Sequence, residues 1–365
     1  MLNINLRNFD WPLLLSVFLL SCVGLAVIYS VNLSQEKFDY SLLIKQATVL
    51  VSGFVLLFIF AFFDYRTLGS LGWLFYLLAL VLLGVVLVLG TVIHGTRGWF
   101  NIFGLSFQPV EIVKIFFIFF LARFLHNQAG RRLSWRFVGK ALIILLPVLV
   151  LILMQPDWGS AIIILLSWLL MIWFSDIDKK YVYVALVLLA VLAVLAWAVI
   201  LRDYQKERFL NFVNPERDPL NQGYNVRQSI IAIGSGGFLG RGLGLGPQSQ
   251  LRFLPETEAD FIFASLAEEL GFVGVAVIIF LYGLFFWRLL KIVHTARDDF
   301  SQLLALGLTT LFFLQFMINV GMVAGLLPVT GLPLPFISSG GSFLIISLIG
   351  VGVLESVAMK NRGVI

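Results

Sequence analysis

Acidic side chains gather where one apolar segment begins, and there they could carry out acid–base chemistry. The sequence Leu254-Pro-Glu-Thr-Glu-Ala-Asp260 runs directly into the apolar stretch Phe261–Ala264. Asp260 therefore lies at the edge of a predicted membrane helix, where its carboxylate could accept a proton as a general base. It could instead cap the helix N-terminus, because aspartate suits that position and the helix dipole. Residue types alone leave both roles open, and Glu256 and Glu258 are near enough in sequence to influence its charge.

A second ionisable pair, Glu111 and Lys114, lies inside another apolar segment. The residues are three apart, so they share one face of a helix. Charged residues within a membrane segment are costly and usually functional. The pair could hold neighbouring helices together, or Lys114 could face an anionic head group while Glu111 positions it. Arg97 and Trp99 precede the pair in a polar segment, where Trp99 could stack on a sugar or anchor the membrane interface.

The segment Gly234–Gly246 contains seven glycines in 13 residues. It does not match the dinucleotide-binding spacing G-x-G-x-x-G, because Leu239 stands where the third glycine belongs, and it has no Walker lysine. Nucleotide binding is therefore excluded. We expect tight turns here, with backbone nests for phosphate oxygens as the alternative.

Neither a disulfide nor a metal cluster is predicted. Cys22 is the single cysteine, and the three histidines (His94, His126 and His294) are far apart in sequence. The sequence indicates no cofactor with certainty and leaves a divalent-cation requirement open.

The elements that must position these residues are membrane helices. The chain has 365 residues, 60% hydrophobic and 12% charged, whereas soluble domains carry about a quarter charged residues. Runs of about 20 apolar residues cross a bilayer. Ten candidates follow: Trp11–Val31, Gln46–Phe63, Leu68–Gly90, Pro109–Leu125, Ala141–Gln155, Trp158–Ser175, Tyr181–Leu201, Asp260–Trp287, Phe300–Leu327 and Ser342–Val357.

The sequence thus predicts an all-α integral membrane protein, a single domain over residues 1–365 with about ten transmembrane helices. A long extracytoplasmic loop, residues 202–259, is expected between spans seven and eight. With the N-terminus in the cytoplasm, the predicted inside segments hold 14 basic residues and the short outside connections hold four. This bias predicts cytoplasmic N- and C-termini and makes the basic excess a matter of topology rather than nucleic-acid binding. The acidic and glycine-rich segments then lie outside.

Taken together, several stretches resemble the SEDS family (shape, elongation, division and sporulation) of peptidoglycan glycosyltransferases over nearly the whole chain. The RodA branch is the better match, from Asp218-Pro-Leu before Gly223-Tyr-Asn. The stretches that carry the resemblance are Phe107-Gln-Pro-Val-Glu-Ile-Val-Lys114, Gln155-Pro-Asp-Trp-Gly159, Gly223-Tyr-Asn-Val-Arg-Gln-Ser-Ile-Ile-Ala-Ile-Gly-Ser-Gly-Gly237, Gln248-Ser-Gln-Leu-Arg-Phe-Leu-Pro-Glu256, Asp260-Phe-Ile-Phe-Ala264, Ala267-Glu-Glu-Leu-Gly271 and Thr330-Gly-Leu-Pro-Leu-Pro-Phe-Ile-Ser338. The departures are local: Glu258-Ala259 stands where the family commonly has His-Thr, Val110 replaces a serine, and Ser339 replaces a tyrosine.

The resemblance implies polymerisation of lipid II at the outer face of a bacterial plasma membrane during cell elongation. It implies that Asp260 deprotonates or orients the attacking sugar hydroxyl. The expected substrate-binding residues are Lys114, Glu111, Arg97, Trp99, Arg252 and Glu256, with Lys114, Arg97 and Arg252 as candidates for gripping the diphosphate. The expected partners are lipid II, membrane lipids and a class B penicillin-binding protein.

Two other functions fit the same composition. A flippase for the lipid-linked precursor would carry ionisable residues through both leaflets, whereas here they gather on the predicted outer side. A non-catalytic scaffold for a cell-wall machine would need Asp260 for stability alone.

Overall fold

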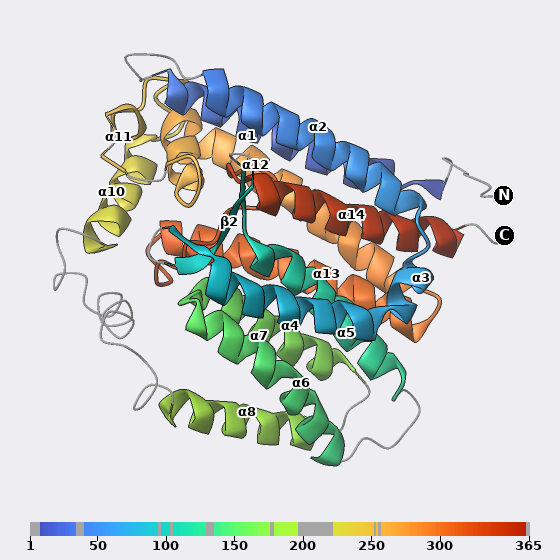
Figure 1. Cartoon of the computed structure of the whole chain (residues 1–365). Coiled ribbons are helices and arrows are strands. Elements are labelled where there is room, and N and C mark those ends of the chain that lie inside the picture. Colours follow the sequence, from blue (N-terminus) through green and yellow to red (C-terminus); the bar gives the residue numbers. More distant parts are fainter. Residues whose placement is uncertain are drawn as a thin grey trace.

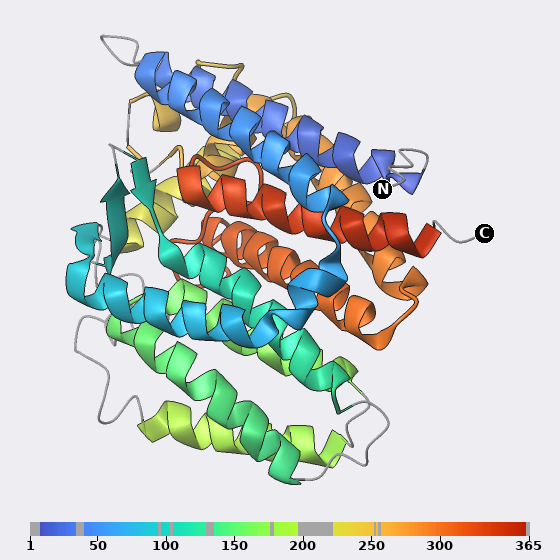
Figure 2. The same cartoon turned by 45° about the vertical axis from the view of Figure 1, so that its right-hand side comes forward.

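The computed structural model describes residues 8–33, 40–93, 96–102, 105–128, 135–175, 179–195, 222–251, 253–254 and 257–362. Long helices lie side by side in one bundle (Figures 1 and 2). The helices are α1 (Trp11–Asn32), α2 (Tyr40–Phe62), α3 (Tyr65–Ser70), α4 (Gly72–Leu89), α5 (Pro109–His126), α6 (Trp135–Met154), α7 (Trp158–Phe174), α8 (Lys179–Leu195), α10 (Gln222–Ser235), α11 (Pro247–Gln250), α12 (Ile262–Thr295), α13 (Asp299–Val323) and α14 (Gly341–Arg362).

Each of the ten predicted segments coincides with helix in the described part of the chain. Seven helices there are long and apolar enough to cross a membrane: α1, α2, α4, α6, α12, α13 and α14. Helix α7 is apolar but shorter, at 17 residues. The protein is therefore a polytopic membrane protein, and a total of ten spans stays a prediction. Helices α13 and α14 are the most buried of the seven and form the centre of the bundle.

The prediction of an all-α fold is wrong in one place. A three-stranded antiparallel sheet links α4 to α5, with strands β1 (Thr91–Ile93), β2 (Thr96–Ile102) and β3 (Leu105–Phe107) in the order β1-β2-β3. Two of the strands are only three residues long, too short to show an alternating pattern. Pairing satisfies backbone groups that a polar loop beside the membrane would otherwise leave to water.

The glycine-rich segment packs against a break in α12. Gly271 interrupts the helix with φ 63° and ψ −164°, a conformation that glycine adopts readily. The freed backbone groups bond to the segment: the Arg241 and Gly242 N–H groups donate to the Glu268 and Glu269 carbonyls at 2.9 Å each. In return, the Phe272 N–H donates to the Gly237 carbonyl at 2.9 Å. The expected tight turns are present, and these two N–H groups bond to protein rather than forming a phosphate nest.

The bundle has two ends of different character. The strands, α10 and α11 lie at one end, called here the cavity end, while α3 and both chain termini lie at the other, the terminus end (Figures 1 and 2). The predicted long loop contains α10 and α11 in its described part, at the cavity end.

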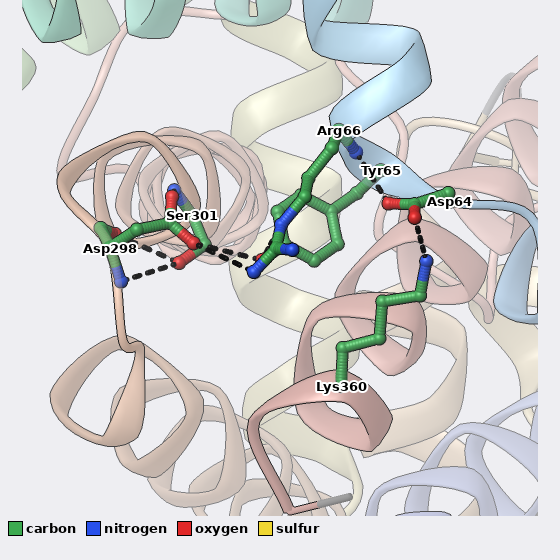
Figure 3. Close-up of polar contacts among 6 residues, drawn as sticks. All are labelled: Asp64, Tyr65, Arg66, Asp298, Ser301 and Lys360. Carbon is green, nitrogen blue, oxygen red and sulfur yellow. Dashed lines mark hydrogen bonds and ion pairs between the residues drawn. The ribbon is translucent and has the colours of Figure 1, made fainter. Parts of the chain in front are cut away.

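Ionic and hydrogen-bonded pairs tie several helices together at the terminus end (Figure 3). The Tyr65 hydroxyl donates to Asp298 Oδ2 at 2.9 Å, and Lys360 pairs with Asp64. Asp298 and Ser301 form a capping box, with the Ser301 N–H donating to Asp298 Oδ1 at 2.9 Å. These contacts join α3 to the start of α13 and to the end of α14.

The two carboxylates in this network lie outside the spans, and their pKa values reflect their partners. Burial raises the pKa of Asp298, but hydrogen bonds from Ser301 and Tyr65 outweigh it and leave the pKa below the ordinary 3.8. Asp64 behaves in the same way. Burial raises its pKa, but Lys360 and the Arg66 N–H lower it by more, so the pKa lies below its ordinary value. Both groups are therefore stabilised in their charged form.

A buried ion pair lies nearby. Arg288 donates from Nε to Asp10 Oδ1 at 2.8 Å and pairs with Oδ2 as well, in a two-pronged contact. The Asp10 N–H donates to Glu355 Oε2 at 3.0 Å. Glu355 is fully buried, so it packs within the bundle and does not extend to solvent.

Candidate functional site

A cavity of about 280 Å³ opens at the cavity end, where several distant segments meet. Its walls come from strand β2, the first turns of α5, α7 and α14, and the segments 259–260 and 329–333. Among its lining residues are three of the predicted site residues: Asp260, Glu111 and Trp99. They lie far apart in sequence, so the fold alone brings them together.

Asp260 lies at the rim, partly exposed, just before α12. The helix begins at Ile262 with Phe261 at the N-cap position, so Asp260 lies one residue before the N-cap. Its backbone carbonyl accepts a hydrogen bond from Asn319 Nδ2 at 3.0 Å, and the same amide group also donates to Leu332 O at 2.7 Å. Asn319 thereby joins both walls of the cavity around the carboxylate.

Two further contacts hold the backbone around Asp260. The Ser338 hydroxyl donates to the Ala259 carbonyl at 2.6 Å, and the Ser339 N–H donates to the Glu258 carbonyl at 2.8 Å. Facing the carboxylate is Gly331, which adopts φ 71°; a Cβ at this position would lie 3.5 Å from Asp260 Oδ2. The backbone around Asp260 is thus held by α13 and by the segment that precedes α14.

Glu111 and Lys114 form a buried ion pair one turn inside α5. Lys114 Nζ lies 2.8 Å from both Glu111 oxygens. Glu111 is 4% exposed and lines the cavity, whereas Lys114 is 1% exposed and lies behind it. The structure therefore contains the predicted pair, and Glu111 is the member that faces the cavity.

Gln108 and Asp157 join two helix N-termini below the cavity. Asp157 caps α7 by accepting a hydrogen bond from the Ser160 N–H at 3.0 Å, and its other oxygen accepts one from Gln108 Nε2 at 3.2 Å. Gln108 is the N-cap residue of α5. Both line the cavity. Neither residue was predicted to belong to the site, although Gln108 and Asp157 lie in two of the stretches that carry the family resemblance.

A bulge in the sheet decides which side chains of β2 reach the cavity. The pairing of β1 with β2 shifts where Thr91 opposes Trp99 and Val92 opposes Arg97, leaving Gly98 as an extra residue. An extra residue reverses the alternation of side chains, so Thr96 and Trp99 both line the cavity. Arg97 is not among the described lining residues, and its Nε donates to the Gly90 carbonyl at 3.3 Å.

Two of the predicted site residues have no described position. Arg252 and Glu256 lie outside the described residues. Glu268 and Glu269, which belong to one of the stretches that carry the family resemblance, are both buried in α12. Glu268 accepts hydrogen bonds from the Gln248 and Ser249 N–H groups at 2.8 and 3.0 Å, and Glu269 accepts one from the Ser30 hydroxyl at 2.6 Å.

The helix N-termini supply the positive potential of the cavity. Helices α5, α7 and α14 all direct their first turns at it, and α12 begins at its rim. Each N-terminus carries roughly half a positive charge. No lysine, arginine or histidine occurs among the described lining residues. No group of three or more metal-ligating side chains was found within the described ranges either. This arrangement suits a negatively charged group of a ligand beside an acidic side chain.

Comparisons with known proteins show the family of the chain. The family model of the FtsW, RodA and SpoVE cell cycle proteins matches residues 11–363. The chain is 40% identical over 287 residues to the peptidoglycan glycosyltransferase MrdB of Escherichia coli K12, covering 79% of this chain and 77% of the relative. It is 35% identical over 362 residues to the stage V sporulation protein E of Bacillus subtilis, covering 97% and 98%.

Solved structures share the whole architecture. A chain from a peptidoglycan synthase complex that coordinates polymerization and crosslinking superposes with a TM-score of 0.81 at 32% identity, covering 97% of this chain and 98% of that one. The rod shape determining protein RodA of Thermus thermophilus superposes with a TM-score of 0.72 at 29% identity, with the same coverage. The chain therefore belongs to the FtsW/RodA/SpoVE family of membrane proteins, the SEDS family.

Proposed function

We propose that this protein is a RodA-type peptidoglycan glycosyltransferase whose reaction takes place in the cavity beside Asp260. The observation that carries the proposal is the meeting of Asp260, Glu111 and Trp99 in one cavity lined by three helix N-termini. Such a cavity offers a base, an aromatic surface and a favourable place for negative charge, which are the needs of sugar transfer from a diphosphate. Related chains named peptidoglycan glycosyltransferases support the assignment.

In this mechanism the donor and the acceptor are lipid II, or lipid II and a growing glycan. The 4-hydroxyl oxygen of an N-acetylglucosamine attacks C1 of the donor's N-acetylmuramic acid, and the bond from C1 to the diphosphate oxygen breaks. The configuration at C1 inverts. The Asp260 carboxylate takes the hydroxyl proton as the new bond forms. The undecaprenyl diphosphate leaves with the electron pair.

The leaving diphosphate gains negative charge, and we assign its stabilisation to the N-terminal turns of α5, α7 and α14. Lys114 contributes from behind Glu111, since its ammonium already contacts both Glu111 oxygens. Arg97 and Arg252 remain candidates for the outer part of the diphosphate path. Trp99 presents an aromatic face to the sugar, because it lines the cavity from β2.

A flippase is the alternative from another class, and the terminus end argues against it. The buried charges there are paired with one another, as Arg288 is with Asp10, and the ring of contacts around Asp298 joins neighbouring helices. A transport path would instead need accessible polar groups on both sides of the membrane.

The proposed orientation places the cavity end outside the plasma membrane and both termini in the cytoplasm. A cysteine at Asn101 on β2, in a Cys22→Ser background, tests this. We expect an impermeant maleimide to label Asn101→Cys in intact spheroplasts and to leave Asp299→Cys unlabelled until the cells are lysed. The reverse pattern would place the cavity in the cytoplasm and refute the mechanism.

The activity test uses purified protein in detergent with lipid II, with and without a class B penicillin-binding protein as the proposed partner. Detergent removes the two compartments, so a pure flippase forms no product. We expect glycan strands from the wild type and none from Asp260→Asn. Product from Asp260→Asn at the wild-type rate would remove Asp260 from the chemistry, while an Asp260-dependent flippase would give no polymer from either protein.

A further inference from the structure

The glycine-rich loop Gly236–Gly246 turns large apolar side chains outward. Leu239 is 77% exposed, Leu245 70%, Phe238 68% and Leu243 53%. Exposed apolar side chains gathered on one short loop indicate a surface that another apolar phase covers. None of these four side chains is among the described lining residues of the cavity.

Most backbone N–H groups of the same loop donate to protein. Besides the bonds to the carbonyls of Glu268 and Glu269, the Val273 N–H donates to the Phe238 carbonyl at 3.2 Å, and the Gly240 N–H donates to the Gly236 carbonyl at 2.9 Å. The Gly244 N–H donates to Glu269 Oε1 at 3.2 Å. Irregular backbone survives at membrane depth only where its polar groups are satisfied by protein. Five of the eight N–H groups between residues 238 and 245 therefore bond to protein, those of Gly240, Arg241, Gly242, Gly244 and Leu245, while the large apolar side chains point outward.

The exposed surface of the loop continues into the apolar face of α12. The Phe238 ring stacks on Phe272, with centroids 5.7 Å apart and planes 21° apart. Phe272 is 62% exposed, and farther along the same helix Val277 and Phe280 are 52% and 69% exposed. Helix α12 is one of the helices long and apolar enough to span the membrane, so this stripe faces lipid. The loop extends the stripe beyond the break at Gly271.

Charge is confined to one position. Arg241 is the single charged residue between Gly236 and Gly246, and it is exposed. A long basic side chain can reach from an apolar boundary to the lipid phosphates. A loop in water, or one that faces the polar rim of a protein partner, usually carries more charged residues than this one.

We propose that residues 238–245 insert into the bilayer and that the acyl chains of the leaflet on the cavity side cover them. The loop would then be a membrane-embedded wedge held by the broken helix α12, with Arg241 at the level of the head groups. The inserted loop would fix the start of the chain segment that runs through α11 toward Asp260, and it would fix it at the hydrocarbon boundary. The proposal concerns lipid contact and holds whether or not Asp260 is the base.

Site-directed spin labelling tests the proposal on the full-length protein in lipid nanodiscs. The single native cysteine is replaced as Cys22→Ser, and one label is placed at Leu239→Cys or Leu243→Cys. Phe280→Cys on the lipid-facing stripe and Asn101→Cys on β2 are the controls for lipid and for water. All four positions are exposed, and size exclusion verifies that each labelled protein is folded. Collisions with oxygen and with a water-soluble nickel chelate are measured.

We expect the oxygen-to-nickel collision ratio at positions 239 and 243 to match that at position 280 and to exceed that at position 101 severalfold. A ratio like that at position 101 would mean that the loop is in water and would overturn the proposal. Immobilised labels that neither reagent reaches would mean that protein, a second copy or a partner, covers the loop, and would overturn it as well.

Discussion

The two ends of the bundle use charge in opposite ways. At the terminus end, Asp64 pairs with Lys360 and Asp298 accepts from the Tyr65 hydroxyl (Figure 3), and Asp10 pairs with Arg288. At the cavity end, Asp260, Glu111 and Asp157 line an open space, although Glu111 pairs with Lys114 and Asp157 accepts hydrogen bonds from Ser160 and Gln108. Charges that are paired with one another within the protein hold helices in place and need no ligand. Carboxylates lining a cavity at converging helix N-termini retain capacity for a ligand. The terminus end therefore has a structural role, and the cavity end is the part of the protein suited to chemistry.

The largest effect is expected at Lys114. In Lys114→Met, Glu111 would keep a buried charge without its partner, which costs about 3–5 kcal/mol. We expect a much lower thermal midpoint in detergent and loss of lipid II polymerisation. The double variant Glu111→Gln/Lys114→Met removes both charges, so it should regain most of the stability while polymerising poorly. Full activity of the double variant would show that the pair is structural only, like those at the terminus end.

At the terminus end, Arg288→Met tests the opposite half of the comparison. It leaves the Asp10 carboxylate buried without its guanidinium partner, which costs up to about 3–5 kcal/mol. The thermal midpoint should fall, but the polymerisation rate per folded molecule should stay at the wild-type value. The control Asp10→Asn/Arg288→Met should recover stability. A rate that fell in both variants at a permissive temperature would mean that this end takes part in the reaction.

The glycine-rich loop should respond through its backbone. Gly240 has φ 82°, and a Cβ there would lie 2.1 Å from the Glu269 carbonyl oxygen. Gly240→Ala should therefore cost more than the about 1–2 kcal/mol of a left-handed alanine. The matched control is Gly234→Ala in α10, where a Cβ meets nothing within 4 Å; a helical alanine there stabilises by up to about 1 kcal/mol. Equal thermal midpoints for the two variants would argue against the packing of this loop on α12.

The smallest effect is the acid response of the terminus end. Because the pKa values of Asp64 and Asp298 are lowered, their contribution is present above the ordinary value of 3.8 and is lost as pH falls through their lowered values. Both groups are partly exposed, so the contribution of each is below about 1 kcal/mol. Asp298→Asn keeps an oxygen for the Ser301 N–H and removes the charge. Its thermal midpoint should fall less steeply than that of the wild type between about pH 5 and pH 3; parallel curves would contradict the assigned pKa.

The sequence predicted the helices well because long apolar runs leave a membrane segment no other structure. It also predicted Asp260, Glu111, Lys114 and Trp99 as residues of interest. It could not show that three of them share one cavity. That meeting depends on how α5, α12 and β2 pack, and Asn319, which joins Asp260 to Leu332, has no local signal that distinguishes it from other polar residues in a span.

Other features were out of reach for physical reasons. Strands of three residues carry no periodic pattern, so the sheet was missed. The bulge at Gly98 decides on which side of β2 the Arg97 side chain lies, and the sequence did not predict this bulge. Glu268 and Glu269 lie beside a helix break, and their partners come from the glycine-rich segment, α11 and α1. The run of glycines predicted turns, but it did not predict that these turns bond to the backbone at the break in α12.

The most direct test compares Asp260→Asn with Asp298→Asn, one matched removal of charge at each end. Both purified proteins are given lipid II in detergent, and glycan formation and thermal midpoint are measured on the same samples. We predict that Asp260→Asn loses about 100- to 10,000-fold in rate with an unchanged midpoint, while Asp298→Asn keeps its rate with a slightly lower midpoint. Wild-type polymerisation by Asp260→Asn would contradict the account.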